Sequence, residues 1–206
     1  LGFVAALSGF RAVAASILNL QAHTAWSRVE WGRLKSIYDT MCALDPRNMQ
    51  SWDMGGWHMA FNASVAALQD ETQPRIALRL KAQREYFKAG EDFYLRGIEN
   101  NPDHALLYER LAMVYRDKFQ DHEKASIYFD RAAAQSDAMP YVHRFGAYEL
   151  AKVPGREREA YARLKGLYDR GEQEHLPTLL KLLGQMEEKL NVPREQRTYN
   201  PTPQKP

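Results

Sequence analysis

The histidines are the side chains most suited to metal binding or acid–base chemistry in this 206-residue chain. They are His23, His58, His104, His122, His143 and His175. None of them pairs with another at the three- or four-residue spacing that places two ligands on one helix face, and the His-Glu-x-x-His pattern of zinc proteases does not occur. We therefore expect every histidine to be a surface or packing residue, and we predict no metal and no cofactor.

Nucleophilic and acid–base motifs are equally sparse. Cys42 is the single cysteine, so no intrachain disulfide can form. It lies in a run of apolar helical positions, which predicts a buried and unreactive thiol. No Gly-x-Ser-x-Gly elbow occurs. The carboxylate neighbours Asp70-Glu71 and Glu187-Glu188 would point in different directions on a helix. The sequence thus predicts no catalytic residues.

Composition and charge describe an ordinary globular chain. Apolar residues make up 45%, and 28 Lys and Arg balance 26 Asp and Glu, for a net charge of +2. A dedicated nucleic-acid binder usually carries a basic stripe, so we expect no nucleic-acid partner. The length fits one domain or one short solenoid.

Apolar residues recur at three- and four-residue steps almost throughout, which predicts an all-α fold without strands. Trp31, Leu34, Tyr38, Met41 and Leu44 form one such stripe. A long helix is expected over residues 75–99, after Pro74, and a final helix over residues 175–190. Short turns containing Pro46, Pro102, Pro140 and Pro154 separate the helices, which favours antiparallel neighbours.

Helix pairs between proline turns resemble the tetratricopeptide repeat (TPR). Trp52-Asp53-Met54-Gly55-Gly56 resembles the start of its helix A, and Gly90, Tyr94, Gly97 and Pro102 have the spacing of its helix B. The best match begins at Tyr108 and continues through Ala125, Phe129 and Ala132, with one extra residue before Ala125. A step of 35 residues separates Phe129 from Leu164, close to the 34-residue TPR period. The resemblance covers residues 10–170.

This resemblance implies a TPR-like α-solenoid of antiparallel helix pairs, with an inserted long helix and a C-terminal capping helix. Small residues would let helices A and B approach, and aromatic residues would fill the space to the next repeat. The packing residues implied in this way are Trp52, Tyr94, Gly97, Tyr108, Ala125, Phe129 and Ala132.

The same resemblance places part of helix A on a concave groove. Trp57, Ala60 and Phe61 would face this groove from one repeat. Glu109, Arg110, Met113 and Arg116 would face it from the next, giving an apolar and basic surface for a peptide. Trp57 and Phe61 have a second interpretation, because they could instead pack against the inserted helix at residues 77–88.

The two ends differ from the middle, and we divide the chain into residues 1–26, 27–190 and 191–206. Because the chain opens on Leu1 instead of Met, we expect a processed or incomplete product. Residues 1–10 are almost wholly apolar but too few to span a bilayer. They are either the last turns of a membrane anchor or part of a buried first helix. Residues 191–206 are rich in proline and polar residues, which predicts an extended or disordered tail.

These observations favour a non-catalytic scaffold or assembly subunit of a membrane-associated complex. The expected partners are other proteins, with possible membrane contact through the N-terminus. A soluble TPR adaptor that binds short peptides is the alternative, with a cytoplasmic location instead of a membrane-associated or envelope one. An enzyme is the weakest of the three readings, because no motif supports it.

Overall fold

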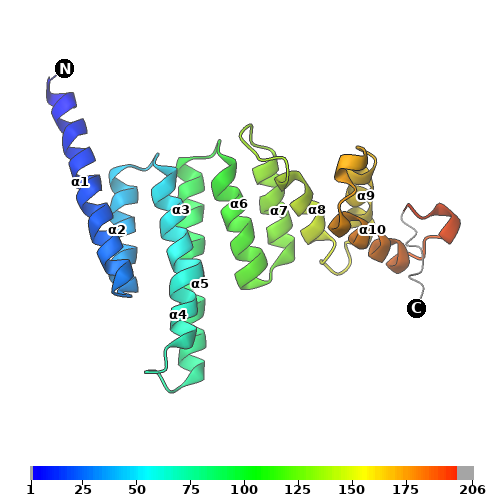
Figure 1. Cartoon of the computed structure of the whole chain (residues 1–206), viewed down its shortest axis with the longest axis horizontal. Coiled ribbons are helices and arrows are strands. Elements are labelled where there is room, and N and C mark those ends of the chain that lie inside the picture. Colours follow the sequence, from blue (N-terminus) through cyan, green and yellow to red (C-terminus); the bar gives the residue numbers. More distant parts are fainter. Residues whose placement is uncertain (1, 199–206) are drawn as a thin grey trace.

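A computed structural model describes the backbone of residues 2–198 and the side chains of residues 13–198. Across the described residues the fold is all-helical and contains no strand, as the periodicity predicts. The helices stand side by side in one row, with α1 and α10 at opposite ends (Figure 1). Successive connections alternate between the two edges of this row, so neighbouring helices run antiparallel.

The helices begin and end close to the predicted turns. The main helices are α1 (Gly2–Ser27), α2 (Trp31–Leu44), α3 (Met49–Trp57), α4 (Ser64–Gln69), α5 (Ile76–Asn100), α6 (Ala105–Val114), α7 (His122–Ala133), α8 (Val142–Leu150), α9 (Glu157–Tyr168) and α10 (Pro177–Lys189). Two π-helical turns, η1 (His58–Ala63) and η2 (Tyr115–Phe119), continue α3 and α6. Two short 3₁₀ turns are η3 (Glu172–Glu174) and η4 (Arg194–Gln196).

Side-chain caps fix the starts of two described helices. The Asn48 side chain accepts a hydrogen bond from the Ser51 amide at the start of α3, and Asp121 does the same for α7 through Lys124. Such caps satisfy amides that have no partner within the helix. The amide of Ala105, the first residue of α6, instead donates over 2.8 Å to Asp137, which lies beyond α7. The start of α6 is therefore tied to a loop that is distant in sequence.

Residues 49–100 form the longest unit, a hairpin in which α3, η1 and α4 run antiparallel to α5. Its far half, made of α4 and the first part of α5, projects well beyond the neighbouring helices (Figure 1). The long helix predicted over residues 75–99 is α5, which runs from Ile76 to Asn100. The inserted segment therefore lengthens both helices of one pair.

Close helix contact holds this hairpin together. A Cβ on Gly56 would lie 2.5 Å from the Tyr94 ring, and a Cβ on Gly90 would lie 2.6 Å from the Cβ of Ala60. Larger side chains would push α3 and α5 apart. Gly55 meets the Phe93 ring in the same way, so both glycines of α3 lie at the contact with α5.

All seven packing residues implied by the resemblance are buried. They are Trp52, Tyr94, Gly97, Tyr108, Ala125, Phe129 and Ala132. One core cluster extends from Ala22 to Val142, and a second joins α8, α9 and α10. Phe145 of α8 packs against both clusters and links them.

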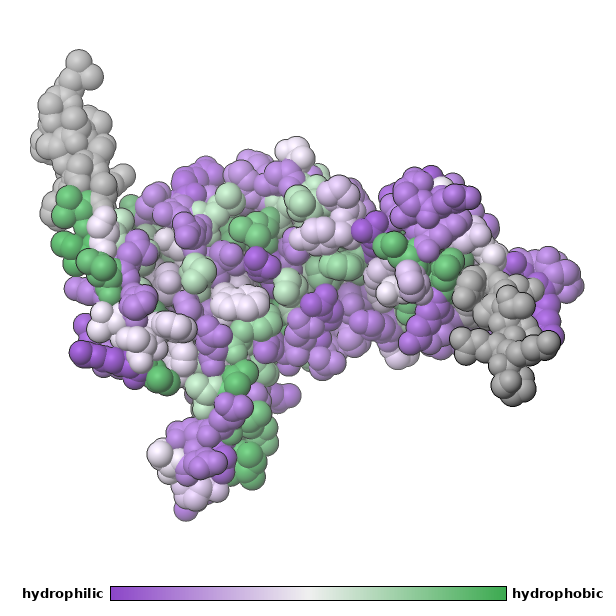
Figure 2. All heavy atoms as spheres, viewed as in Figure 1, coloured by the Kyte–Doolittle hydropathy of each residue, from purple (hydrophilic) through white to green (hydrophobic). Residues whose placement is uncertain are grey.

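The described part of α1 has two different sides. Ala22 and Ala25 are buried, whereas Val13, Ile17 and Leu20 are exposed, Leu20 by 71%. Figure 2 shows apolar surface on α1 and along the projecting hairpin. Among the described residues no helix is long and apolar enough to cross a membrane. The side chains of residues 1–12, on which the two interpretations of the N-terminus depend, lie outside the described residues.

The first part of the proline-rich tail folds back onto α10. The backbone amide of Thr198 donates over 2.6 Å to Glu187, a carboxylate with no exposed surface. The Arg197 side chain donates to the carbonyl of Val192. Residues 191–198 thus cover the end of α10, and residues 199–206 of the predicted tail lie outside the described residues.

Candidate functional site

The predicted groove residues Trp57 and Phe61 stack on each other where α3 passes into η1. Their ring centroids are 4.2 Å apart, and the ring planes differ by 15°. Both side chains are half-buried, and Phe61 also packs against the core. The pair therefore forms a half-buried stack of two rings.

Arg110 of α6 joins this aromatic pair to the next helix. Its Nε donates over 3.0 Å to Oδ1 of Asp53, and its guanidinium lies 5.8 Å from the Trp57 ring centroid. Met113, one turn later, lies 3.7 Å from the same guanidinium through its sulfur. The ion pair with Asp53 fixes the guanidinium over Trp57, where the ring face attracts a cation.

Lys118 of η2 contacts the stacked pair at Phe61, whereas Arg110 contacts it at Trp57. Its Nζ lies 4.3 Å from the Phe61 ring centroid and 5.8 Å from that of Phe87 on α5. Partial burial lowers the pKa of the Lys118 ammonium, and neighbouring Asp117 opposes that shift. We call Trp57, Phe61, Arg110, Met113 and Lys118 the aromatic–cation cluster.

Glu109 and Arg116, predicted for the same groove, lie outside this cluster. Glu109 is buried and accepts a 2.9 Å hydrogen bond from the Tyr141 hydroxyl. Arg116 pairs with Asp117, and its guanidinium lies 5.7 Å from the Phe129 ring. Glu109 thus contacts the residue that precedes α8, and Arg116 lies against a ring of α7.

Ala60, also expected on the groove, is fully buried against α5. The alternative interpretation of Trp57 and Phe61, packing against residues 77–88, stays a prediction. Lys118 lies between Phe61 and Phe87, so the inserted segment contributes one wall. Trp57 instead contacts Arg110 on the opposite side.

The π-helical turns η1 and η2 were not predicted. They follow α3 and α6 at nearly the same distance from the helix start, and they carry Phe61, Arg116 and Lys118. A π turn accommodates one additional residue within a helix and is frequent at functional sites. The extra residue before Ala125 was the only signal in the sequence that pointed to η2.

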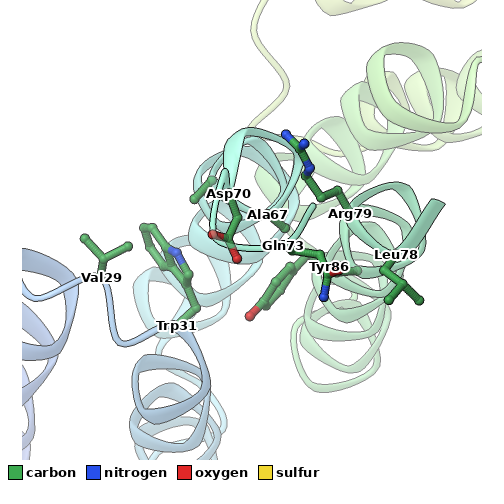
Figure 3. Close-up of a pocket in the computed structure, with 10 residues that line it drawn as sticks. Val29, Trp31, Ala67, Asp70, Gln73, Leu78, Arg79 and Tyr86 are labelled. Carbon is green, nitrogen blue, oxygen red and sulfur yellow. The ribbon is translucent and has the colours of Figure 1, made fainter. Parts of the chain in front are cut away.

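A separate hollow lies between the α1–α2 turn and the projecting hairpin (Figure 3). It encloses about 560 Å³ between Val29, Trp31, Ala66, Ala67, Asp70, Gln73, Leu78, Arg79, Ala82 and Tyr86. Two buried donors facing this region, Trp31 Nε1 and Arg79 Nε, have no hydrogen-bond acceptor within the described residues. The Asp70 carboxylate accepts two hydrogen bonds from Thr72 through Oδ1, which lower its pKa. Either donor offers a hydrogen bond to a ligand oxygen. The hollow carries no net charge to select an ionic ligand, because its one cation, Arg79, is balanced by its one anion, Asp70.

Cys42 is buried as expected, and burial raises the pKa of its thiol to about 12, so the thiol stays protonated at neutral pH. No three His, Cys, Asp or Glu side chains come together in the described part of the chain to hold a metal ion. The aromatic–cation cluster combines rings with two cations, a chemistry suited to contacts with apolar groups and carboxylates.

The sequence matches no protein-family model and no curated protein.

Proposed function

We propose that this chain is a TPR-like α-solenoid that holds other proteins together and catalyses no reaction. The alternation of antiparallel helices in one row supports this assignment (Figure 1). So does the burial of Phe129 and Leu164, which occupy equivalent positions 35 residues apart. In this assignment η2 accommodates the residue that exceeds the repeat pattern.

The aromatic–cation cluster carries the functional proposal. Trp57 and Phe61 come from one helix pair, and Arg110 and Met113 come from the next. Aromatic and Arg side chains dominate the binding energy of protein interfaces because they combine a large contact area with directed polar contacts. A surface built in this way by successive repeats suits an extended segment of a partner protein.

The scaffold is proposed to be an assembly subunit of a membrane-associated complex. The exposed side chains Val13, Ile17 and Leu20 lie four and three residues apart on one face of α1, and Trp26 is 45% exposed near its end. Apolar residues followed by a Trp are typical of a helix that meets a membrane interface. The soluble peptide-binding adaptor remains the alternative.

The test is affinity purification of the tagged full-length protein from its native cells in mild detergent, followed by mass spectrometry. Partners recovered in stoichiometric amounts are then compared between the unmodified protein and Trp57→Ala. Truncating an interface Trp costs about 2 kcal/mol, a roughly thirtyfold loss of affinity. We therefore expect the variant to lose its partner.

Tyr161→Ala is the matched control, because it truncates a partly buried ring on α9, away from the cluster. It should retain the partner. Equal recovery with Trp57→Ala and the unmodified protein would refute the cluster as the binding surface. Recovery of the protein alone from the soluble fraction would refute the membrane-subunit proposal and favour the adaptor.

A further inference from the structure

An inside corner forms where the projecting half of α5 meets the end of η2 (Figure 1). It encloses about 940 Å³, and its walls come from Ala77, Leu80, Lys81, Gln83, Arg84, Glu85, Phe87, Lys88, Lys118 and Phe119. We call this hollow the basic corner. It exists because the hairpin extends past its neighbour.

Four cations line the basic corner against one carboxylate, Glu85. Lys81 and Glu85 approach to only 3.9 Å, and both side chains are more than 60% exposed. Arg84, Lys88 and Lys118 form no salt bridge with any residue that the structure describes. Such a surplus of unpaired positive charge attracts an anionic group.

Apolar side chains form the floor between these cations. Leu80 is 47% exposed, and the rings of Phe87 and Phe119 meet edge to face at 5.9 Å. An exposed Leu beside two partly buried rings offers an apolar side chain a place to pack. The corner therefore combines contacts for apolar groups with contacts for carboxylates.

Lys118 belongs to both surfaces. Its ammonium faces Phe61 of the aromatic–cation cluster and Phe87 of the basic corner. The two surfaces are thus continuous across one side chain. A segment bound along the cluster would pass into the corner without leaving the protein.

Resting on the proposed function, we infer that the partner segment is an acidic peptide with interspersed large apolar side chains. Its apolar side chains pack on Leu80 and Phe119, and its carboxylates meet Arg84, Lys88 and Lys118. A peptide fits this place better than a bilayer does, because Lys118 lies on η2 at the end of α6, and the hairpin projects beyond the neighbouring helices (Figure 1). A bilayer is flat, so one that touches the tip of the hairpin does not reach the side chains of the basic corner behind the tip.

The test is fluorescence anisotropy with the full chain and a labelled peptide in which Glu alternates with Leu and Phe. We expect saturable binding that weakens as salt rises, because the screening length falls from about 30 Å at 0.01 M to about 8 Å at 0.15 M. Arg84→Glu combined with Lys88→Glu should weaken binding about tenfold, since two attractive contacts become repulsive. The same peptide with Gln in place of Glu should bind at least about tenfold more weakly.

Arg158→Glu combined with Arg170→Glu is the matched control. Both side chains are exposed cations near the other end of the row, and neither forms a salt bridge within the described residues. Affinity should change by less than about twofold in this variant. Circular dichroism melting curves establish that both double variants fold.

Four results would overturn the inference. Equal weakening of peptide binding by the two double variants would show that the effect depends on net charge alone. Equal binding of the Glu and Gln peptides would show that the corner does not recognise the carboxylates. Sedimentation with phosphatidylserine vesicles that depends on Arg84 and Lys88, without peptide binding, would make the corner a lipid surface. If Trp57→Ala abolishes partner recovery while the acidic peptide fails to bind, the proposed function stands and this inference falls.

Discussion

Replacing Gly90 with Ala tests the close approach of α3 and α5 directly. The new Cβ would lie 2.6 Å from the Cβ of Ala60, 2.9 Å from its backbone nitrogen and 2.9 Å from the carbonyl oxygen of Gly56. Two of these three atoms belong to the backbone of the facing helix. Neither can rotate away, so the two helices must separate.

The expected loss of stability combines two opposing effects. Ala is favoured over Gly inside a helix by about 1 kcal/mol. Overpacking a tight contact costs about 1–3 kcal/mol, and backbone contacts lie at the upper end of that range. The net destabilisation is therefore about 2 kcal/mol. For a chain of this size it lowers the melting temperature by roughly 4–8 °C.

The measurement is thermal unfolding followed by circular dichroism, with Gly166→Ala as the matched control. Gly166 also lies within a helix, α9, but a Cβ there would meet no atom within 4 Å. That variant should gain up to about 1 kcal/mol from helix propensity alone. If Gly90→Ala proved as stable as Gly166→Ala, α3 and α5 could not lie as close together as the structure places them.

Two further predictions concern polar groups among buried rings. Trp52→Phe should lower the unfolding free energy by about 1–3 kcal/mol, because it removes a partly buried 2.9 Å hydrogen bond to the Pro46 carbonyl. Trp31→Phe removes a donor that has no acceptor among the described residues, so it should cost less than about 1 kcal/mol in the same denaturant titration. Burial lowers the pKa of His58, so the folded state favours the neutral ring; stability should be complete above the unfolded pKa of about 6.5 and decline as the pH falls below it. His58→Gln should reduce that decline in unfolding curves recorded between about pH 8 and pH 5, and an unchanged pH dependence would show that His58 is not responsible.

The sequence predicted the helices better than the contacts that their surface side chains make with neighbouring helices. Periodic apolar residues predicted the helices, and the turns at Pro46 and Pro102 fall between helices as expected. Residue size predicted the packing positions, because Gly90, Tyr94 and Gly97 follow a spacing that only a close helix pair would require. These features depend on local geometry, which a single sequence carries.

The candidate site was predicted only in part. Trp57, Phe61, Arg110 and Met113 come together, but Glu109 turns to Tyr141, which is 32 residues distant. A carboxylate accepts a hydrogen bond from a donor that lies near it in space, and the sequence does not reveal which donor that is. Lys118 was not predicted at all, since nothing in its local pattern indicates that it faces Phe61 and Phe87.

The sequence by itself therefore determined the all-helical class, the helix boundaries and the small and aromatic residues that contact one another within a helix pair. The tertiary structure alone decided where the pairs leave open surface. The basic corner exists because the insertion extends two helices past their neighbours, and the π turn η2 aims Lys118 toward the junction. Helical periodicity arises from contacts a few residues apart, whereas charges and rings gather at the corner through the packing of segments about 30 residues apart.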